Sequence, residues 1–476
     1  MIIIIGYFAV LLAISYFTGK NATNLTFFLG NRQSPWYIVA FGMISASLSG
    51  VTFISVPGYV INSDFSYMQI VLGYLLGYAV IANILMPMYY KLNLTSIYTY
   101  LETRFGSHSY KAGASFFLLS RTIGAAFRLF LVANVLQITL FNQWNVPFEA
   151  TVVITILLIW LYTFRGGIRT IIWTDSLQTF FMLTAVGVTV YLISKDLNLS
   201  FTGMVHEVAG SKHSKIFFFD NWNGEYHFIK QFLAGAFIAI VMTGLDQDMM
   251  QKNLSCRNIR EAKKNMYWFS ISLIPVNLLF MSLGALLILY ARREGIPIPD
   301  QSDDLFPLIS TQGYLGPVVG MFFLMGLVSA AYSGADSAPT TLATSFTVDI
   351  PNTKGMQEKP LKRLRKKVHV GMSVVLVIII LIFNAVNDEA VISALFTVAG
   401  YTYGPLLGLY TFGLFTRYQV RDRWVPLVTV LSPIICALLS YYSETLFNGY
   451  QFGFELLIVN GFITLAGLFL LSRKNV

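Results

Sequence analysis

Residues 45–58 read SASLSGVTFISVPG and lie in the middle of an apolar stretch of membrane-spanning length, residues 36–61. Small, hydroxylated and helix-breaking residues at this depth predict an interrupted helix. An interruption in hydrocarbon is tolerated only where protein, water or a bound ion satisfies the freed carbonyl groups. The segment is therefore a candidate cradle for a cation and a substrate. A packing seam of small residues is the alternative, but Pro57 and Gly58 favour the broken helix.

Hydrophobic residues dominate the whole chain. Of its 476 residues 55% are hydrophobic and only 12% are charged, with a mean hydropathy of +0.64. This composition leaves too little charge to cover soluble domains and predicts a membrane protein. The net charge of +9 does not indicate nucleic acid, because most Lys and Arg residues fall in short connections on one side of the membrane. Cys256 and Cys436 have no metal-ligand spacing, so we expect no transition-metal site.

Apolar stretches bounded by charged or turn residues predict about thirteen membrane spans in one all-α transporter domain, residues 1–476. The basic residues in the connections predict an N-terminus outside and a cytoplasmic C-terminus. Ten spans form two groups of five, 36–194 and 229–414, between an extra first helix and loop, 1–35, and two accessory helices, 425–472. Five is odd, so the groups enter the membrane from opposite sides, as in an inverted repeat. The spans are 2–18, 36–61, 67–90, 113–140, 149–164, 172–194, 229–248, 266–290, 316–345, 369–386, 391–414, 425–444 and 453–471.

A second polar cluster lies deep in the ninth predicted span. Ser333, Asp336 and Ser337 stand at positions i, i+3 and i+4, which places two hydroxyls and a carboxylate on one helix face. Hard cations such as Na⁺ prefer oxygen ligands of this kind. A carboxylate within a span is costly and by default functional. The alternative is a protonated Asp336 bonded to a backbone carbonyl.

Five more charged positions lie in or at the ends of predicted spans. Asp175, at the start of the sixth span, could bind a cation or pair with a nearby arginine. Arg121 faces protein or a water-filled cavity, where a substrate carboxylate, Asp246 or Asp336 could be its partner. Structural pairing or snorkelling suits Arg128 equally well. For Asp246 and its neighbour Asp248, at the inner end of the seventh span, we expect loop contacts.

Motifs for other chemistries are missing. The five histidines are scattered over loops and span ends, and no H-E-x-x-H motif, catalytic triad pattern or G-x-x-x-x-G-K-[ST] loop occurs. We therefore expect neither an enzyme nor a nucleotide-driven pump. An ion gradient is the energy source left for transport.

With these segments in view, nearly the whole chain resembles the sodium:solute symporter family, which includes sodium/glucose, sodium/proline and bacterial sialic acid transporters. Together the shared motifs are highly specific. They are FLGNR at 28–32 with PW at 35–36, SLSGVTF at 47–53, YLETRF at 100–105, GGI at 166–168 with WTD at 173–175, QDMMQK at 247–252, ADS at 335–337, DI at 349–350 and GLF at 413–415. The resemblance implies the leucine-transporter fold with a five-plus-five inverted repeat, and Na⁺ as the coupling ion.

The resemblance also implies site residues. A common sodium site would use backbone carbonyls of Ser45, Leu48 and Ala330 with the hydroxyl of Ser333. A second sodium site, present in some members, would involve Ser333 with Asp175, Asp336 and Ser337. The implied substrate contacts are Ser47, Ser49 and Thr52, and the carboxylate-binding arginine of some members aligns near Gly124, one turn from Arg121.

Two departures from the family pattern matter. Gly334 replaces a second hydroxyl ligand at the sodium site, and residues 237–242 are apolar where sugar-binding members are polar.

From the motifs and the resemblance together we expect Na⁺-driven symport of a small organic solute by alternating access in the inner (plasma) membrane, with Arg121 favouring a carboxylate such as a sugar acid or monocarboxylate. A sugar, polyol or amino-acid symporter, a membrane solute sensor and a Na⁺ leak channel are the alternatives. Apart from the solute and the lipid bilayer, no nucleic acid and no obligatory protein partner is expected.

Overall fold

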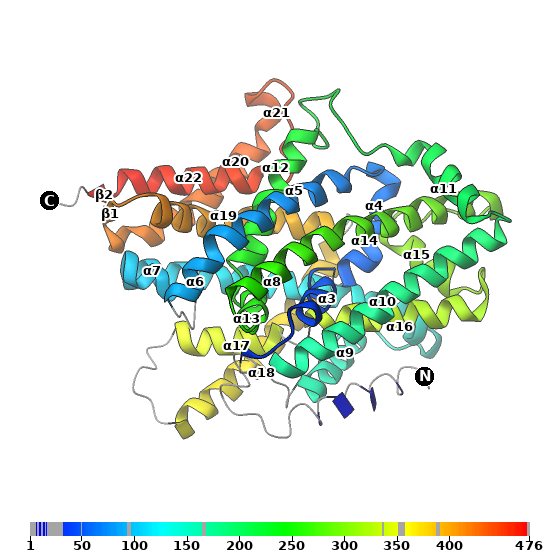
Figure 1. The fold of residues 1–476 in the computed structure, drawn as a ribbon, viewed down its shortest axis with the longest axis horizontal. Helices are drawn as coiled ribbons and strands as arrows, with labels where there is room; N and C mark the ends of the chain where they lie inside the picture. The colour runs from blue at the N-terminus through cyan, green and yellow to red at the C-terminus, as the bar shows by residue number, and fades with distance from the viewer. Residues whose placement is uncertain are drawn as a thin grey trace.

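Nearly all of the chain that the computed structural model describes is helical (Figure 1). Helices satisfy their backbone groups internally, as a chain in hydrocarbon must. The structure describes residues 6, 9–10, 13–14, 16, 32–48, 50–92, 97–163, 168–335, 338–350, 358–386 and 391–473. Within them the strands are one antiparallel pair, β1 (Gln419–Val420) and β2 (Ser472–Arg473). The all-α prediction is therefore confirmed.

The helices keep the numbering of Figure 1. They are α3 (Trp36–Ser47), α4 (Gly50–Ser63), α5 (Tyr67–Val80), η2 (Ile81–Leu85), α6 (Met86–Leu92), α7 (Thr99–Arg104), α8 (Ser107–Leu136), η3 (Gln137–Phe141), η4 (Asn142–Trp144), α9 (Phe148–Thr163), α10 (Ile168–Asp196), α11 (Phe201–Gly210), η5 (Lys212–Ser214), α12 (Phe228–Ala239), η6 (Ile240–Gly244), α13 (Gln247–Leu254), α14 (Ile259–Glu294), η7 (Ser302–Asp304), α15 (Leu305–Thr311), α16 (Gly316–Ala335), α17 (Ala338–Asp349), α18 (Glu358–Val386), α19 (Val391–Phe415), η8 (Asp422–Trp424), α20 (Val425–Tyr441), α21 (Ser443–Leu446) and α22 (Leu456–Leu470).

Among the described residues, two helix pairs are sharply bent at a short break. The predicted interruption is confirmed at Leu48, where φ of −88° and ψ of 47° end α3, and the helices on either side are bent by 54°. A second break, which the sequence analysis did not predict, lies between η6 and α13, where the bend is 72°. Each bent pair stands at the beginning of one of the two predicted groups of five spans.

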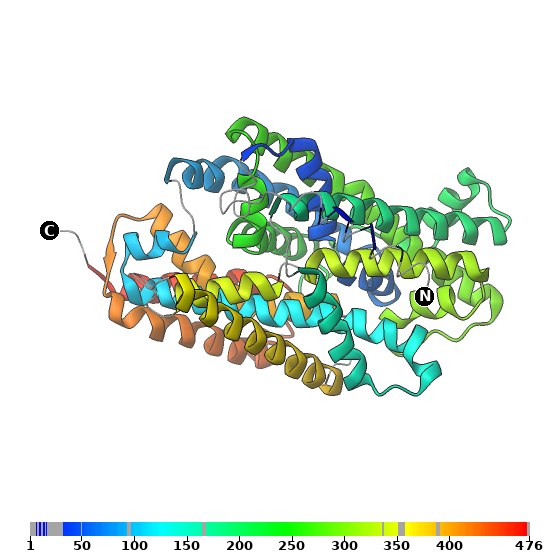
Figure 2. The same ribbon diagram turned by 90° about the horizontal axis from the view of Figure 1, so that it is seen from below.

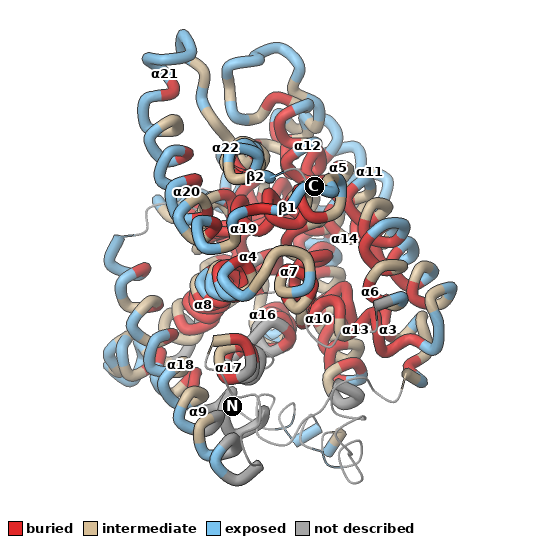
Figure 3. The backbone as a smooth tube through the Cα atoms, turned by 90° about the vertical axis from the view of Figure 1, so that its left-hand side faces the viewer, coloured by how far each residue is buried: buried red, intermediate tan, exposed pale blue. Residues whose placement is uncertain are grey.

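Close helix packing surrounds these breaks. Helix α10 packs against α3 and α16, and α5 packs against α12. The last pair approaches closely through two glycines: a Cβ on Gly73 would collide with the carbonyl oxygen of Phe232, and one on Gly235 with that of Ile70. Figure 3 shows buried backbone in the interior and exposed residues on the peripheral helices α18 and α20.

Seven of the described helices are long and apolar enough to cross a membrane, or up to nine if each bent pair is one span. Shorter apolar helices stand in three more of the predicted spans, at Phe148–Leu157, Gly316–Ala330 and Leu456–Leu470. Most of the predicted span 2–18 lies outside the described residues. The count of about thirteen therefore stays a prediction.

Candidate functional site

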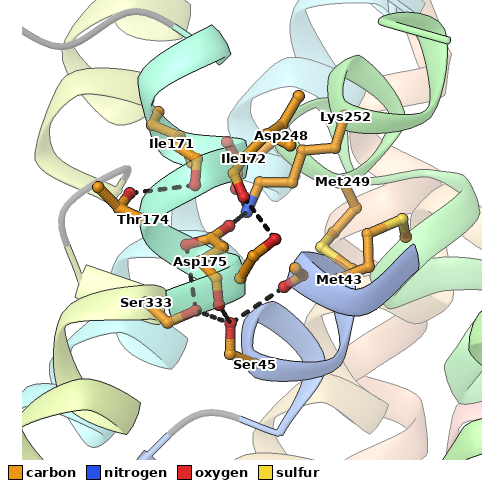
Figure 4. A network of polar contacts seen from close by, with 12 residues as sticks. Met43, Ser45, Ile171, Ile172, Thr174, Asp175, Asp248, Met249, Lys252 and Ser333 are labelled. Atoms are coloured by element: carbon orange, nitrogen blue, oxygen red, sulfur yellow. Dashed lines mark hydrogen bonds and ion pairs between the residues drawn. The ribbon is translucent and has the colours of Figure 1, made fainter. Parts of the chain in front are cut away.

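Three predicted ion-site residues meet where the first broken helix touches α10 and α16 (Figure 4). The Ser333 hydroxyl donates to Ser45 Oγ at 2.8 Å and lies 3.3 Å from Asp175 Oδ1. Ser45 Oγ is also 2.9 Å from the backbone carbonyl oxygen of Asp175. All three residues are at most 1% exposed. The structure therefore brings together oxygen atoms from three helices at a buried point, which is the donor chemistry that Na⁺ prefers.

Backbone carbonyls at the end of α3 are a second source of oxygen ligands. The Leu48 amide still donates to the Ile44 carbonyl at 2.7 Å, but a helix that ends at Ser47 leaves the carbonyls of its last turn without regular helical donors. Ser45 and Leu48, the expected carbonyl ligands on this segment, lie at that end. Ala330, the third, is fully buried on α16. Two of the three expected carbonyl positions thus lie at the broken end of α3, and the third lies buried on α16.

Part of the predicted second sodium site cannot be placed. Asp336 and Ser337 lie outside the described residues, between the end of α16 at Ala335 and the start of α17 at Ala338. Of that set, Asp175 and Ser333 are in contact, as given above. Among the described residues, no group of three or more His, Cys, Asp or Glu side chains could hold a metal ion.

A lysine holds the carboxylate of Asp175. Lys252 Nζ lies 2.8 Å from Asp175 Oδ2 and 3.9 Å from Asp248 Oδ2, and its side chain is 2% exposed. Sequence reasoning expected a cation ligand or an arginine pair at Asp175 and missed Lys252. The sequence carries no local signal for this contact, because it depends on the bend before α13 and no proline marks that bend.

Arg121 is paired as well. Its Nη1 lies 3.3 Å from Asp246 Oδ2 and its Nη2 lies 3.1 Å from Asp248 Oδ2. Asp246 also caps α13 by accepting from the Met249 amide at 3.0 Å. The expectation of loop contacts for both aspartates is wrong, because the bend after η6 turns them inward, where they are at most 5% exposed. Both terminal nitrogens of Arg121 are therefore held by protein carboxylates.

Arg128 differs from Arg121 in this respect. It lines the central cavity, but no ion pair joins it to any described carboxylate. Its buried Nε, like that of Arg121, has no hydrogen-bond partner. A guanidinium in a span is costly unless it is paired or faces a polar cavity. Arg128 is thus a positive charge that faces the cavity with binding capacity left.

The central cavity, of about 70 Å³, lies beside the broken helices. Of the predicted substrate contacts, Ser47, Thr52 and Arg121 line it, whereas Ser49 lies outside the described residues. Most of the remaining lining is aromatic or apolar. These residues are Ala46, Leu48, Tyr67, Tyr74, Tyr78, Arg128, Ile238, Ala239, Met242, Thr243, Asp248, Met249, Lys252, Ser333, Ile392, Leu395 and Phe396.

A larger cavity of about 340 Å³ lies next to the central one and is lined in part by Glu225 and Tyr226, which precede α12. Phe396 lines both cavities. Its ring stacks on that of Tyr67 with centroids 6.3 Å apart and planes at 8°, and it packs edge-on against Phe454 at 5.1 Å. A buried aromatic stack therefore stands between the two spaces.

Known proteins resemble the chain over nearly its full length. The sodium/sialic acid symporter SiaT of Proteus mirabilis is 25% identical over 462 residues, covering 93% of this chain and 90% of that protein. The human sodium-coupled monocarboxylate transporter 1 is 26% identical over 418 residues, which cover 84% of this chain and 66% of the transporter.

Two solved structures share the fold. The substrate-bound outward-open state of a Na⁺-coupled sialic acid symporter superposes with a TM-score of 0.81 at 19% identity, covering 99% of this chain and 98% of the other. A nucleobase-cation-symport-1 family transporter in a closed conformation with bound bromovinylhydantoin gives 0.55 at 16% identity, covering 95% of each chain. These likenesses confirm the predicted leucine-transporter fold. The profile of the sodium:solute symporter family matches residues 27–419, so the chain belongs to that family and is a Na⁺-coupled membrane transporter, not an enzyme.

Proposed function

We propose that this transporter couples Na⁺ entry to the uptake of a small organic solute that carries a carboxylate, with Arg128 as the anchor of that group. The observation that carries the proposal is the contrast between the two cavity arginines. Arg121 already contacts two aspartates, whereas Arg128 lines the cavity without a carboxylate partner among the described residues. A bidentate pair between guanidinium and carboxylate supplies both charge neutralisation and orientation.

The relatives are consistent with this substrate class. By name, the two relatives described above transport sialic acid and monocarboxylates with sodium. The cavity supplies the rest of such a site: hydroxyls of Ser47 and Thr52 for polar groups of the solute, and the rings of Tyr67 and Tyr74 for its apolar surface. Arg128 replaces Arg121 as the predicted carboxylate partner, because of the aspartates that hold Arg121.

For the coupling ion we propose the sodium ligands that the sequence implies. Carbonyls of Ser45, Leu48 and Ala330 with the Ser333 hydroxyl form the common site. Inward movement of one Na⁺ at a membrane potential of 100 mV supplies about 2.3 kcal/mol before the concentration gradient is counted. Because the ion would join the broken helix to α16, its binding favours the arrangement in which the substrate cavity is complete.

A second sodium site would draw on Asp175, Asp336 and Ser337 in addition to Ser333. Lys252 already supplies a positive charge at Asp175. An ion that uses the Asp175 carboxylate therefore has to share it with Lys252 or displace the lysine.

The membrane arrangement completes the proposal. Two inverted groups of five spans, 36–194 and 229–414, each begin with a broken helix, so the two breaks occupy equivalent places. We propose insertion in the inner (plasma) membrane with the N-terminus outside and the C-terminus in the cytoplasm. The 340 Å³ cavity is then the outer vestibule, and the Phe396 stack is the barrier that opens and closes during alternating access.

The test is Na⁺-dependent thermal stabilisation of the purified protein across monocarboxylates, sialic acid, sugars, polyols and amino acids. We expect a carboxylate to stabilise the protein only when Na⁺ is present. Arg128→Gln should weaken binding of that solute by about a hundredfold or more, the usual cost of removing one partner of a buried charge pair. Arg292→Gln, at an exposed position on α14, is the control and should bind normally. Stabilisation by a neutral sugar or polyol, unaffected by Arg128→Gln, would refute the substrate class.

A further inference from the structure

The first turns of α18 carry a dense positive charge. Six of the nine residues from Lys359 to Lys367 are Lys or Arg, and Glu358 is the sole acidic residue between positions 350 and 387. Two of these basic side chains, Arg363 and Lys367, are described and exposed. No ion pair joins either of them to a described carboxylate. Their charges therefore face the surroundings of the protein.

The same helix continues directly into an apolar, lipid-exposed span. Val370, Val374, Ile378 and Ile382 are between 51% and 58% exposed. They follow Lys367 at steps of three and four residues, which places them on one helix face with it. Only 17% of the most apolar stretch of this helix, within residues 367–386, is buried. Helix α18 lies at the edge of the molecule (Figures 2 and 3). The exposed stripe is a surface for acyl chains.

Helix geometry sets the depth of the basic side chains. With a rise of 1.5 Å per residue, Lys367 lies about 5 Å and Arg363 about 10 Å beyond Val370 along the axis. From Lys367 to Val386 the helix rises about 29 Å, close to the thickness of about 30 Å of the hydrocarbon core. Both basic side chains therefore lie where the phosphate groups of the adjoining leaflet lie, on the helix face that meets lipid.

From this placement we propose that Arg363 and Lys367 form a binding site for the phosphate groups of anionic phospholipids in the leaflet at the N-terminal end of α18. Basic clusters next to a membrane span attract anionic lipid with about 1 kcal/mol per Lys or Arg near the surface. The site lies apart from the solute cavity and does not depend on which solute is transported. If the positive charges serve only to orient the chain during insertion, the folded protein has no preference for anionic lipid.

The experiment titrates dioctanoyl phosphatidylglycerol into micelles of the purified protein and follows thermal stability. We expect stabilisation that saturates and weakens with added salt. In Arg363→Gln/Lys367→Gln, the concentration for half of the stabilisation should rise about thirtyfold, as expected from the loss of two surface charges. The charge-preserving variant Arg363→Lys/Lys367→Arg should respond like the wild type.

The controls separate charge, headgroup and position. Arg292→Gln/Arg293→Gln also removes two positive charges, but from exposed residues in the last turn of α14. This variant should be stabilised by phosphatidylglycerol like the wild type. Phosphatidylcholine of the same chain length and soluble glycerol phosphate should not stabilise the protein. An unchanged response in Arg363→Gln/Lys367→Gln, or equal stabilisation by phosphatidylcholine, overturns the proposal.

Discussion

The ion pair between Lys252 and Asp175 allows a quantitative prediction of how variants of either residue change the free energy of unfolding. The two charges are 2.8 Å apart, and both side chains are at most 2% exposed. At an effective dielectric constant of about 20, their attraction amounts to about 6 kcal/mol. Desolvation of the two ions offsets much of this gain. The pair as a whole therefore adds little net stability, whereas either charge left alone is costly.

The perturbation is Lys252→Met, which keeps an unbranched side chain only one atom shorter and removes its charge. It leaves the Asp175 carboxylate buried without its nearest cation, so we expect a loss of about 3–5 kcal/mol in the free energy of unfolding. Asp175→Asn should lower the free energy of unfolding by less, because Lys252 Nζ still has a carboxylate oxygen of Asp248 at 3.9 Å. In the double variant neither charge remains. We expect its loss in the free energy of unfolding to be about 2–3 kcal/mol smaller than the sum of the losses in the two single variants.

The assay is chemical unfolding in mixed micelles, in Na⁺-free buffer and again with Na⁺. We expect Na⁺ to restore part of the stability of Lys252→Met, since the freed carboxylate can then bind the ion. The matched control replaces Lys230, another buried lysine, by Met in the Asp175→Asn background, where the two losses should add. If the Lys252 and Asp175 losses also add to within about 0.5 kcal/mol, the reasoning is refuted.

Three further predictions concern other groups. Arg128→Lys keeps the charge but loses the bidentate geometry, so the KM for the carboxylate solute should rise about tenfold while Na⁺ binding, followed by thermal stabilisation, stays unchanged. Ser333→Ala removes the hydroxyl between Ser45 and the Asp175 carboxylate; half-saturation for Na⁺ in uptake should rise about tenfold, and an unchanged value would remove Ser333 from the ion site. Burial raises the pKa of Asp303, in the connection before α15, from 3.8 to about 6. The folded protein thus binds this proton more tightly than the unfolded chain, and stability should fall by about 3 kcal/mol as the pH rises from 4 to above 6. Asp303→Asn should remove this component of a thermal pH profile, while a profile of unchanged slope would contradict the assignment.

The first break in the helices could be predicted because its cause is local. The break lies at Leu48, among the small and hydroxylated residues of the segment 45–58, whereas α4 continues through Pro57 and Gly58. The meeting of Ser45, Asp175 and Ser333 was also predicted, but through the family resemblance, which supplies long-range proximity that spacing within one helix cannot.

The charge pairing could not be predicted in the same way. It depends on the second break, and the sequence 240–246, IVMTGLD, contains a single glycine and no proline to signal a bend of 72°. Without that bend, Asp246, Asp248 and Lys252 read as residues of a span end facing a loop. With it, α13 turns their side chains against Arg121 and Asp175 and leaves Arg128 as the cavity arginine without a described carboxylate partner.

Na⁺ coupling is tested most directly by solute uptake into proteoliposomes driven by an inward Na⁺ gradient, using the carboxylate identified by stabilisation. Na⁺-coupled symport predicts saturable accumulation that increases with an inside-negative membrane potential, stops when choline or K⁺ replaces Na⁺, and is lost in Arg128→Gln. Accumulation that proceeds equally without Na⁺, or binding without any movement of solute in counterflow, would contradict it.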